Sequence, residues 1–389
     1  MNREIYFDNS ATTRIRDDVI DTILQTYLEA YGNPSSLHKK GIQAEKKVNT
    51  AREIISKAIN STSSEIIFTS GGTESNNLAV KGIAQRYKRR GMHLITSKIE
   101  HPSVLNVFKF LEQEGFNVSY IGVDNNGVIL LEELKKEIAP ETILVSIMMV
   151  NNEVGSIQPI EQISKILKKY DHEIIFHVDG VQALGKIPID VEKMGIDLLT
   201  ISGHKLHSPK GSGALFLRDG LELQPLFDGG GQERGLRSGT ENVPAIAGLG
   251  RAVEIASAEI DYFNEKIIKL KKLLIDRVLQ EIPHTYLNSP SVDSCFSAPH
   301  IANISFEGIK GEILVHAMEE HGVYISTGSA CSSRGSHKSH VLYAMGCDTR
   351  RIESSVRFSF SILNSVEEVN FCVDKLKQVV EELRTIIRR

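Results

Sequence analysis

Two side chains that follow neighbouring apolar runs of the sequence could do chemistry together. Asp179 closes the run Phe176-His-Val-Asp179, and Lys205 follows the next apolar run in Ser202-Gly-His-Lys205. A carboxylate is seldom buried without a partner, and a lysine desolvated in a cleft can lose its proton and attack a carbonyl carbon. Taken alone, Asp179 could equally be a strand-end cap and Lys205 a surface lysine, and Lys210 competes for the nucleophilic role.

A third feature earlier in the chain is suited to binding an anion. The run Thr69-Ser-Gly-Gly-Thr-Glu-Ser-Asn-Asn77 joins an apolar strand to a predicted helix that begins near Thr73. Free N–H groups at a helix start attract a phosphate, and glycine allows its close approach. An ordinary strand-to-helix turn capped by Thr73 or Ser75 would use the same residue types. The run is not a Walker motif, because no Gly-Lys-Ser/Thr follows.

The three features together match the needs of pyridoxal 5'-phosphate. An aspartate keeps the pyridine nitrogen protonated, a lysine holds the aldehyde carbon, and a glycine-rich helix start takes the phosphate. Asp179 and Lys205 fit the first two tasks, and Gly72 with Thr73 fits the third. We therefore predict this cofactor.

Further polar residues follow other predicted strands and could complete such a site. His101 could stack on a ring and carry protons near neutral pH, and Asn152 or Gln182 could bond a ring hydroxyl. Each of these residue types is more often an ordinary hydrogen-bonding loop residue. The glycine-rich segment 229–240 ends in Thr240 and could bind the phosphate that lies in the site of another chain.

The elements that must position these residues fall into two groups. Between 65 and 218, short β-branched runs alternate with helical patterns, which predicts an α/β fold with a largely parallel sheet covered on both faces. A long helical stretch is then expected from about 242 to 282, followed by a smaller α+β unit. We predict a large domain at 15–250, and a small domain at 251–389 that includes an N-terminal arm at 1–14.

Composition limits the partners that are expected. The chain has 389 residues and a net charge of −4, so no direct nucleic-acid contact is expected. No apolar signal segment is visible at the N-terminus, and the longest apolar run, around 143–150, is far too short to span a membrane. A cytoplasmic protein without a membrane contact is the expectation.

The four cysteines show no metal-ligand spacing, and no metal site is predicted. Disulfides are rare in a reducing cytosol, so Cys295, Cys347 and Cys372 are expected to be small buried hydrophobic residues. Cys331 differs, because it lies in the Gly-, Ser- and His-rich stretch 328–340, which is typical of a mobile loop.

The chain resembles the NifS/IscS class of cysteine desulfurases, in the aminotransferase class V group of fold-type I pyridoxal-phosphate enzymes. The resemblance runs nearly from end to end, and its most specific segments are Ser-Gly-His-Lys and Gly-Ser-Ala-Cys-Ser-Ser. It implies a homodimer whose large domain holds a mostly parallel seven-stranded sheet. Matching motifs are Tyr6-Phe-Asp-Asn-Ser-Ala-Thr-Thr13, Gly32-Asn-Pro-Ser-Ser36 with His38, the run 69–77, Arg237-Ser-Gly-Thr240 and Arg357-Phe-Ser-Phe360.

The resemblance also implies a role for each matching residue. Lys205 would hold the cofactor, Asp179 would pair with the pyridine nitrogen, and His101 would stack on the ring. Arg357, with Asn152, would bind the substrate carboxylate, a bidentate task suited to guanidinium. Ring-oxygen contacts would come from Asn152 and Gln182, and phosphate contacts from Gly72, Thr73, Ser202, His204 and, reaching in from the second subunit, Thr240.

The implied reaction takes sulfur from L-cysteine. Lys205 would remove the Cα proton, and the Cys331 thiolate would attack the substrate sulfur, leaving a Cys331 persulfide and L-alanine. Only a thiolate is nucleophilic enough, and His101, His337 or His340 could stabilise it. The sulfur would pass to an acceptor protein that serves iron–sulfur cluster assembly, tRNA thiolation or cofactor sulfuration, and these destinations stay open.

Two other interpretations are weighed against this one. A selenocysteine lyase, or another class V enzyme such as an aminotransferase, would use the same cofactor residues. A non-catalytic sulfur-transfer partner with a vestigial site is a different class of protein. The joint presence of Lys205, Asp179, Arg357 and Cys331 argues against that second interpretation.

Overall fold

The computed structural model describes residues 4–328 and 339–387. Its centre is a seven-stranded sheet in which only β8 runs antiparallel to its neighbours. The sheet confirms the prediction of a mostly parallel α/β fold. Its strands, in spatial order, are β2 (Ile66–Thr69), β8 (Gly213–Leu217), β7 (Leu198–Ser202), β6 (Ile175–Asp179), β5 (Thr142–Met148), β3 (His93–Ser97) and β4 (Asn117–Ile121).

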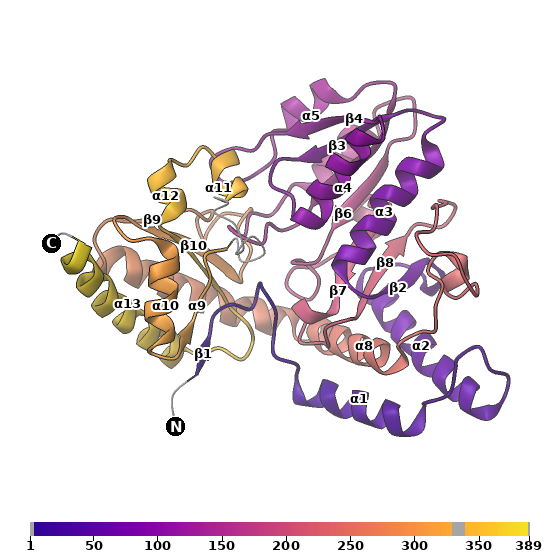
Figure 1. The fold of residues 1–389 in the computed structure, drawn as a ribbon, viewed down its shortest axis with the longest axis horizontal. Coiled ribbons are helices and arrows are strands. Elements are labelled where there is room, and N and C mark those ends of the chain that lie inside the picture. The colour runs from indigo at the N-terminus through magenta and orange to yellow at the C-terminus, as the bar shows by residue number, and fades with distance from the viewer. Residues whose placement is uncertain (1–3, 329–338, 388–389) are drawn as a thin grey trace.

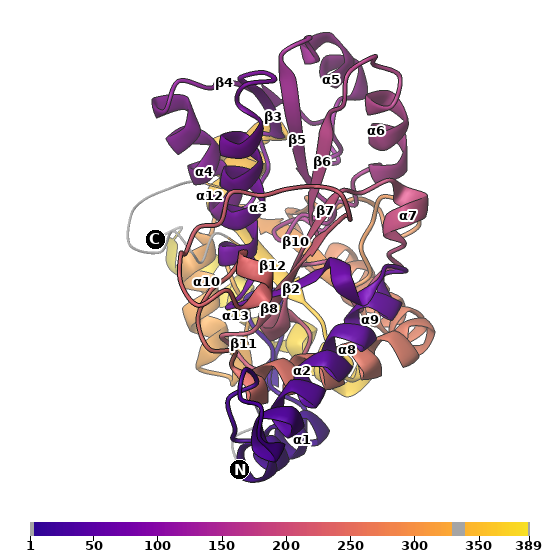
Figure 2. The same cartoon turned by 90° about the vertical axis from the view of Figure 1, so that its right-hand side faces the viewer.

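Helices cover both faces of this sheet because successive strand residues point to opposite sides. In β2, for example, Ile67 packs with α3 and α4, whereas Ile66 and Phe68 pack with the helices of the other face. Figure 2 shows α3 and α4 on one side of the strands and α6 and α7 on the other. One face carries α3 (Gly72–Tyr87) and α4 (Pro102–Gln113), and the other carries α2 (Lys39–Ala58), α5 (Leu131–Glu137), α6 (Ile160–Leu167), α7 (Val191–Met194) and α8 (Val243–Ala258).

A second, smaller layer lies beside the large sheet (Figure 1). Its antiparallel sheet has the order β12–β10–β9, and β1 of the N-terminal arm pairs with β11. The arm residues Ile5 and Phe7 belong to its hydrophobic core. The domain boundaries themselves stay a prediction. The elements are β1 (Ile5–Tyr6), α9 (Ile260–Glu281), β9 (Thr285–Leu287), β10 (Ile301–Phe306), α10 (Gly311–Glu319), β11 (Val323–Tyr324), α11 (His340–Ala344), α12 (Thr349–Glu353), β12 (Ser355–Ser359) and α13 (Val366–Ile387).

The long helix expected from about 242 to 282 is two helices, so that prediction was wrong in detail. α8 ends at Ala258 and α9 begins at Ile260. The physical reason is that the two halves serve different cores. Leu249 of α8 packs in the core of the large sheet, whereas Ile267 of α9 packs in the core of the small layer. The remaining helix, α1 (Asp17–Glu29), packs on α8.

The cysteines differ from expectation at one position. Cys372 is buried and Cys347 is partly buried, but Cys295 is exposed. Cys295 lies in the connection between β9 and β10 and on no packed element face, which explains the error. Cys331 lies outside the described residues. Across 4–328 and 339–387, no helix is long and apolar enough to cross a membrane.

Candidate cofactor site

A cleft of about 540 Å³ opens at the carboxyl ends of the parallel strands. Parallel strands end at the same edge of a sheet, so residues that follow different strands meet there. The small layer contributes Arg357 to the lining, and the N-terminal arm contributes Ser10, Ala11 and Thr12. The predicted site residues that line this cleft are Gly72, Thr73, His101, Asn152, Asp179, Gln182, Ser202, His204, Lys205 and Arg357.

Asp179 is the last residue of β6 and is buried. Its Oδ2 accepts a hydrogen bond from Asn76 Nδ2 at 2.8 Å, and its Oδ1 accepts one from the Val181 N–H at 3.0 Å. Donors directed at both oxygens fix the orientation of the carboxylate. The carboxylate is therefore fixed at the cleft wall, where it can pair with a protonated ring nitrogen.

Lys205 ends a short 3-10 turn, Gly203–Lys205, that follows β7 directly. Its amine donates to two carbonyls of the N-terminal arm, Ser10 O at 2.5 Å and Ala11 O at 2.7 Å. The competing residue, Lys210, also lines the cleft but is exposed. The more enclosed position of its amine favours Lys205 as the nucleophile.

The start of α3 forms a cradle that only glycine can line. Gly71 is the N-cap at φ +151° and carries no side chain to cap the first N–H groups. A Cβ on Gly72 would lie 2.8 Å from Val181 Cγ2 and 3.4 Å from Ser202 Cβ. The cradle thus combines free helix N–H groups with a nearby hydroxyl, the arrangement that binds a phosphate.

Two histidines at the cleft are held neutral near pH 7. Burial lowers the pKa of His101, although the charge of Asp179 opposes the shift. Its Nδ1 accepts from the Ser103 N–H at 3.1 Å, so the proton of the neutral ring sits on Nε2. Burial and then the charge of Lys205 lower the pKa of His204 to about 4. A neutral His101 can stack on a ring, and a neutral His204 can donate to a phosphate oxygen.

The two amides expected at the ring oxygen differ in how they are held. Gln182 donates from Nε2 to Ser10 O at 2.9 Å, and the second N–H of that group can serve a ligand. Asn152 lines the cleft, and its backbone carbonyl accepts from Arg357 Nη1 at 2.9 Å. Both residues can therefore donate into the cleft without losing their anchoring contacts.

Arg357 is a buried guanidinium at the cleft wall. Its Nη2 pairs with Asp8 Oδ1 of the N-terminal arm at 2.7 Å, and its Nη1 donates to Asn152 O. Its Nε is buried and has no partner within the described part of the chain. A buried donor without an acceptor is costly, so this atom points to an anionic ligand such as a carboxylate.

Three predicted residues are not placed in the cleft of the described chain. Thr240 is exposed and does not line it. Its segment is held to α3 by an ion pair between Arg237 and Glu74 at 2.9 Å. Cys331 and His337 lie outside the described residues. Gly328, the last described residue before Cys331, does line the cleft.

Sequence reasoning named no role for two residues that organise the site. Asn76 bridges Asp179 and Ser103 Oγ, each at 2.8 Å, and its place one helical turn after Gly72 could have revealed it. Glu100 is fully buried, and burial raises its pKa to about 8. Its Oε1 accepts from Ser97 Oγ at 2.6 Å and from the Met148 N–H at 2.9 Å, a role without a local sequence signal.

Comparisons with known proteins agree with this geometry. A model of the aminotransferase class V family matches residues 5–371. The cysteine desulfurase IscS of Dictyoglomus turgidum is 45% identical over 386 residues, covering 99% of this chain and 97% of that protein. The IscS of Methanosarcina thermophila is 45% identical over 385 residues, covering 99% and 94%.

Solved structures point the same way. A NifS-like protein superposes with a TM-score of 0.92 at 41% identity, covering 98% of this chain and all of that one. A structure described as SspA in complex with cysteine gives a TM-score of 0.80 at 37% identity, covering 92% and 98%. The fold and the matching family model define an aminotransferase class V enzyme of fold-type I, which depends on pyridoxal phosphate. Within that class, the chain belongs to the NifS/IscS cysteine desulfurases.

The residues present fit this cofactor. The cleft offers a fixed carboxylate at Asp179, an amine at Lys205 and a glycine cradle at the start of α3. Ser10 Oγ and Asn76 Oδ1, in residues that also line the cleft, are buried and lack a partner among the described residues. These unsatisfied polar atoms are what a polar ligand would complete.

Proposed function

We propose that this chain removes sulfur from L-cysteine, releasing L-alanine and leaving the sulfur on Cys331. The observation that carries the proposal is the meeting of Asp179, Lys205 and Arg357 in one cleft with a phosphate cradle. When bound, pyridoxal phosphate supplies an electron sink that makes the Cα proton of an amino acid acidic. A carboxylate-binding arginine beside that sink selects an α-amino acid.

The chain's own residues then divide the work. Asp179 would pair with the protonated ring nitrogen, and the neutral His101 would stack on the ring. Arg357, whose Nε has no partner among the described residues, would hold the substrate carboxylate. The amine of Lys205 takes that proton and returns one later, as a general base and acid.

Cys331 is the proposed sulfur acceptor of this reaction. Support comes from Gly328, which lines the cleft and accepts from Arg357 Nη1 at 3.4 Å. Gly328 lies only three positions before Cys331 in the sequence, so the chain enters this segment beside Arg357. His340 lies at the other end of this segment, with Nε2 3.0 Å from Glu100 O.

A homodimer is also part of the proposal. Five large apolar side chains on α1 and the segment that follows it are more than half exposed, and a second copy of the chain would cover them. A second copy would also bring Thr240 to the neighbouring phosphate cradle. The exposed side chains are Leu24, Tyr27, Leu28, Tyr31 and Leu37.

The destination of the sulfur is proposed at a coarser level. Relatives named IscS support a sulfur-acceptor protein as partner, either an iron–sulfur scaffold or an enzyme of tRNA or cofactor thiolation. We place the reaction in the cytoplasm, because its reducing conditions keep the Cys331 side chain as the free thiol that the attack on sulfur needs.

Isotope labelling tests the proposal. The enzyme is incubated with ³⁵S-labelled L-cysteine. The amount of alanine released is measured, and the residue that carries the label is mapped by mass spectrometry. We expect alanine and Cys331-bound label in equal amounts. Cys331→Ser should bind the cofactor but release no alanine. Full turnover by Cys331→Ser would sink the assignment. Alanine formed from selenocysteine alone would indicate a lyase, and a need for a keto acid would indicate an aminotransferase.

A further inference from the structure

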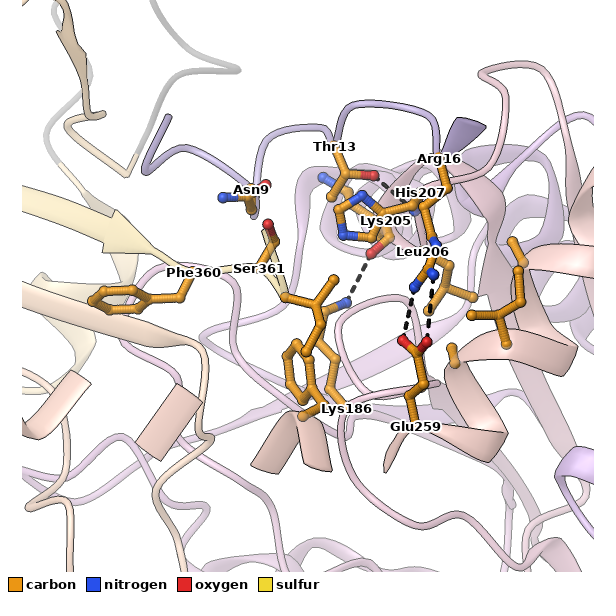
Figure 3. Close-up of a pocket in the computed structure, with 16 residues that line it drawn as sticks. Asn9, Thr13, Arg16, Lys186, Lys205, Leu206, His207, Glu259, Phe360 and Ser361 are labelled. Carbon is orange, nitrogen blue, oxygen red and sulfur yellow. Dashed lines mark hydrogen bonds and ion pairs between the residues drawn. The ribbon is translucent and has the colours of Figure 1, made fainter. Parts of the chain in front are cut away.

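A second lysine lies directly behind Lys205. Lys186 is buried, and its Nζ donates to the backbone carbonyl of Lys205 at 3.0 Å. Figure 3 shows the Lys186 amine pointing at that oxygen, and Lys186 is not among the residues that line the cofactor cleft. The proposed reaction gives this lysine no task.

Burying an amine here is costly. Burial, and then the charge of Lys205, lower the pKa of Lys186 to about 7. An apolar side chain of the same length would avoid this cost. Buried polar groups are usually hydrogen-bonded, and the acceptor of this amine is the backbone carbonyl of Lys205.

Packing alone does not hold the turn from behind. A cavity of about 40 Å³ lies there, bordered by Lys186, Lys205 and His207 (Figure 3). A space of that size admits a few water molecules, since each needs roughly 10–15 Å³. Packing against the turn is incomplete beside this cavity, and the hydrogen bond from Lys186 adds to those that Thr13 makes with the carbonyl of His204.

The hydrogen bond from Lys186 to the carbonyl of Lys205 also joins the two segments that would contact the cofactor ring. Lys186 lies in the turn that follows β6. Asp179 is the last residue of that strand, and Gln182 lies in the same turn as Lys186, whereas Lys205 lies in the turn after β7. The ladder between these strands continues to the bond from Gly180 N–H to Thr200 O at 3.0 Å. Beyond it, the Lys186 amine links one turn to the other.

We propose that Lys186 is a positioning residue that holds the Lys205 turn against the Asp179 turn, so that the Lys205 amine and the Asp179 carboxylate keep the one separation that the rigid cofactor ring requires. The proposal rests on Lys205 being the cofactor lysine. Bond formation joins the amine nitrogen of Lys205 to the aldehyde carbon and releases one water. Near-attack geometry controls such a step, and a displacement of about 1 Å can slow it by up to a hundredfold.

The chain offers a matched control. Lys271 is equally buried, burial lowers its pKa to about 7, and its amine donates to Ser297 Oγ at 2.7 Å and Ala298 O at 2.8 Å. Because these acceptors lie away from the cofactor cleft, Lys271→Met removes a buried amine without touching the Lys205 turn.

The test measures bond formation rather than turnover. Pyridoxal phosphate is added to the full-length chain stripped of cofactor, samples are reduced with borohydride at intervals from pH 6 to 9, and the modified lysine is mapped. We expect Lys186→Met to slow the formation of the bond between pyridoxal phosphate and Lys205 about tenfold or more across the pH range. Lys186→Arg should remain within about threefold of wild type, and Lys271→Met within about twofold, even if its thermal midpoint falls further.

Each result decides the matter. The proposed role of Lys186 would be refuted if Lys186→Met formed the bond between pyridoxal phosphate and Lys205 at the wild-type rate. Equal slowing of that step by Lys271→Met would also refute it. If Lys186→Met does not fold, Lys186→Gln, whose amide is too short to reach the carbonyl, takes its place with the same expectation. If the wild-type chain instead bound pyridoxal phosphate at Lys210, the assignment of Lys205 as the cofactor lysine would be wrong. A failure of the Lys186 proposal is therefore distinguishable from a failure of the Lys205 assignment.

Discussion

The buried acid Glu100 should make the protein less stable as the pH rises. Its carboxyl is fully buried, and burial raises its pKa from 4.5 to about 8. Between these values the folded chain holds a proton that the unfolded chain releases, so the free energy of unfolding falls with pH. The slope is about 1.4 kcal/mol per pH unit for one proton, which amounts to about 3 kcal/mol between pH 4.5 and 7.

Glu100→Gln removes this dependence and keeps the shape of the side chain. The amide oxygen can still accept from Ser97 and the Met148 N–H, whereas the new NH₂ group replaces an oxygen that has no partner in the described structure. A buried NH₂ donor without an acceptor costs about 1–3 kcal/mol at any pH, and the protonated wild-type carboxyl carries an unpaired O–H at the same place. The informative quantity is therefore the change with pH in the difference between variant and wild type.

Urea denaturation of both proteins, each stripped of cofactor, measures that difference from pH 5 to 9. Other buried titrating groups, such as His177, contribute equally to both proteins and cancel. We expect the difference to move in favour of Glu100→Gln by about 1.4 kcal/mol per unit up to about pH 8 and then to level off. Parallel stability curves over this range would refute the claim that Glu100 is buried as a neutral acid.

Three further substitutions test the cleft. Arg357→Lys should raise KM for L-cysteine at least about tenfold with a smaller effect on kcat, measured by alanine release, because an ammonium cannot replace a fixed planar guanidinium. Gly72→Ala should weaken cofactor binding about tenfold or more in an absorbance titration, since its Cβ would lie 2.8 Å from Val181 Cγ2. Asn76→Ala should weaken cofactor binding about tenfold in the same titration, through the lost bond to Asp179 Oδ2. Wild-type values in any of the three would contradict the corresponding contact.

Much of the site could be predicted because its residues follow strands. Asp179 and Lys205 end or follow runs of buried β-branched residues, and the parallel order of β6 and β7 then brings them together. The glycine pair at 71–72 likewise marks a strand-to-helix turn in the sequence itself. Local pattern and topology were sufficient here, since no long-range side-chain contact had to be known.

The rest depended on contacts between distant segments. The bond between Lys186 and Lys205 spans 19 positions, and the pair of Asp8 with Arg357 spans 349. Neither leaves a periodic signal. The division of the 242–282 stretch into α8 and α9 also escaped prediction, because both halves are amphipathic and only the two separate cores distinguish them. Cys331 was identified through the family resemblance alone.

The most direct test of the central claim is to map the lysine that carries the cofactor. The enzyme loaded with pyridoxal phosphate is reduced with borohydride, digested, and analysed by peptide mass spectrometry, with Lys210→Ala and Lys205→Ala in parallel. The account predicts the pyridoxyl group on Lys205 in the wild type and in Lys210→Ala, and no modified lysine in Lys205→Ala. A pyridoxyl group on Lys210, or undiminished labelling of Lys205→Ala, would contradict it.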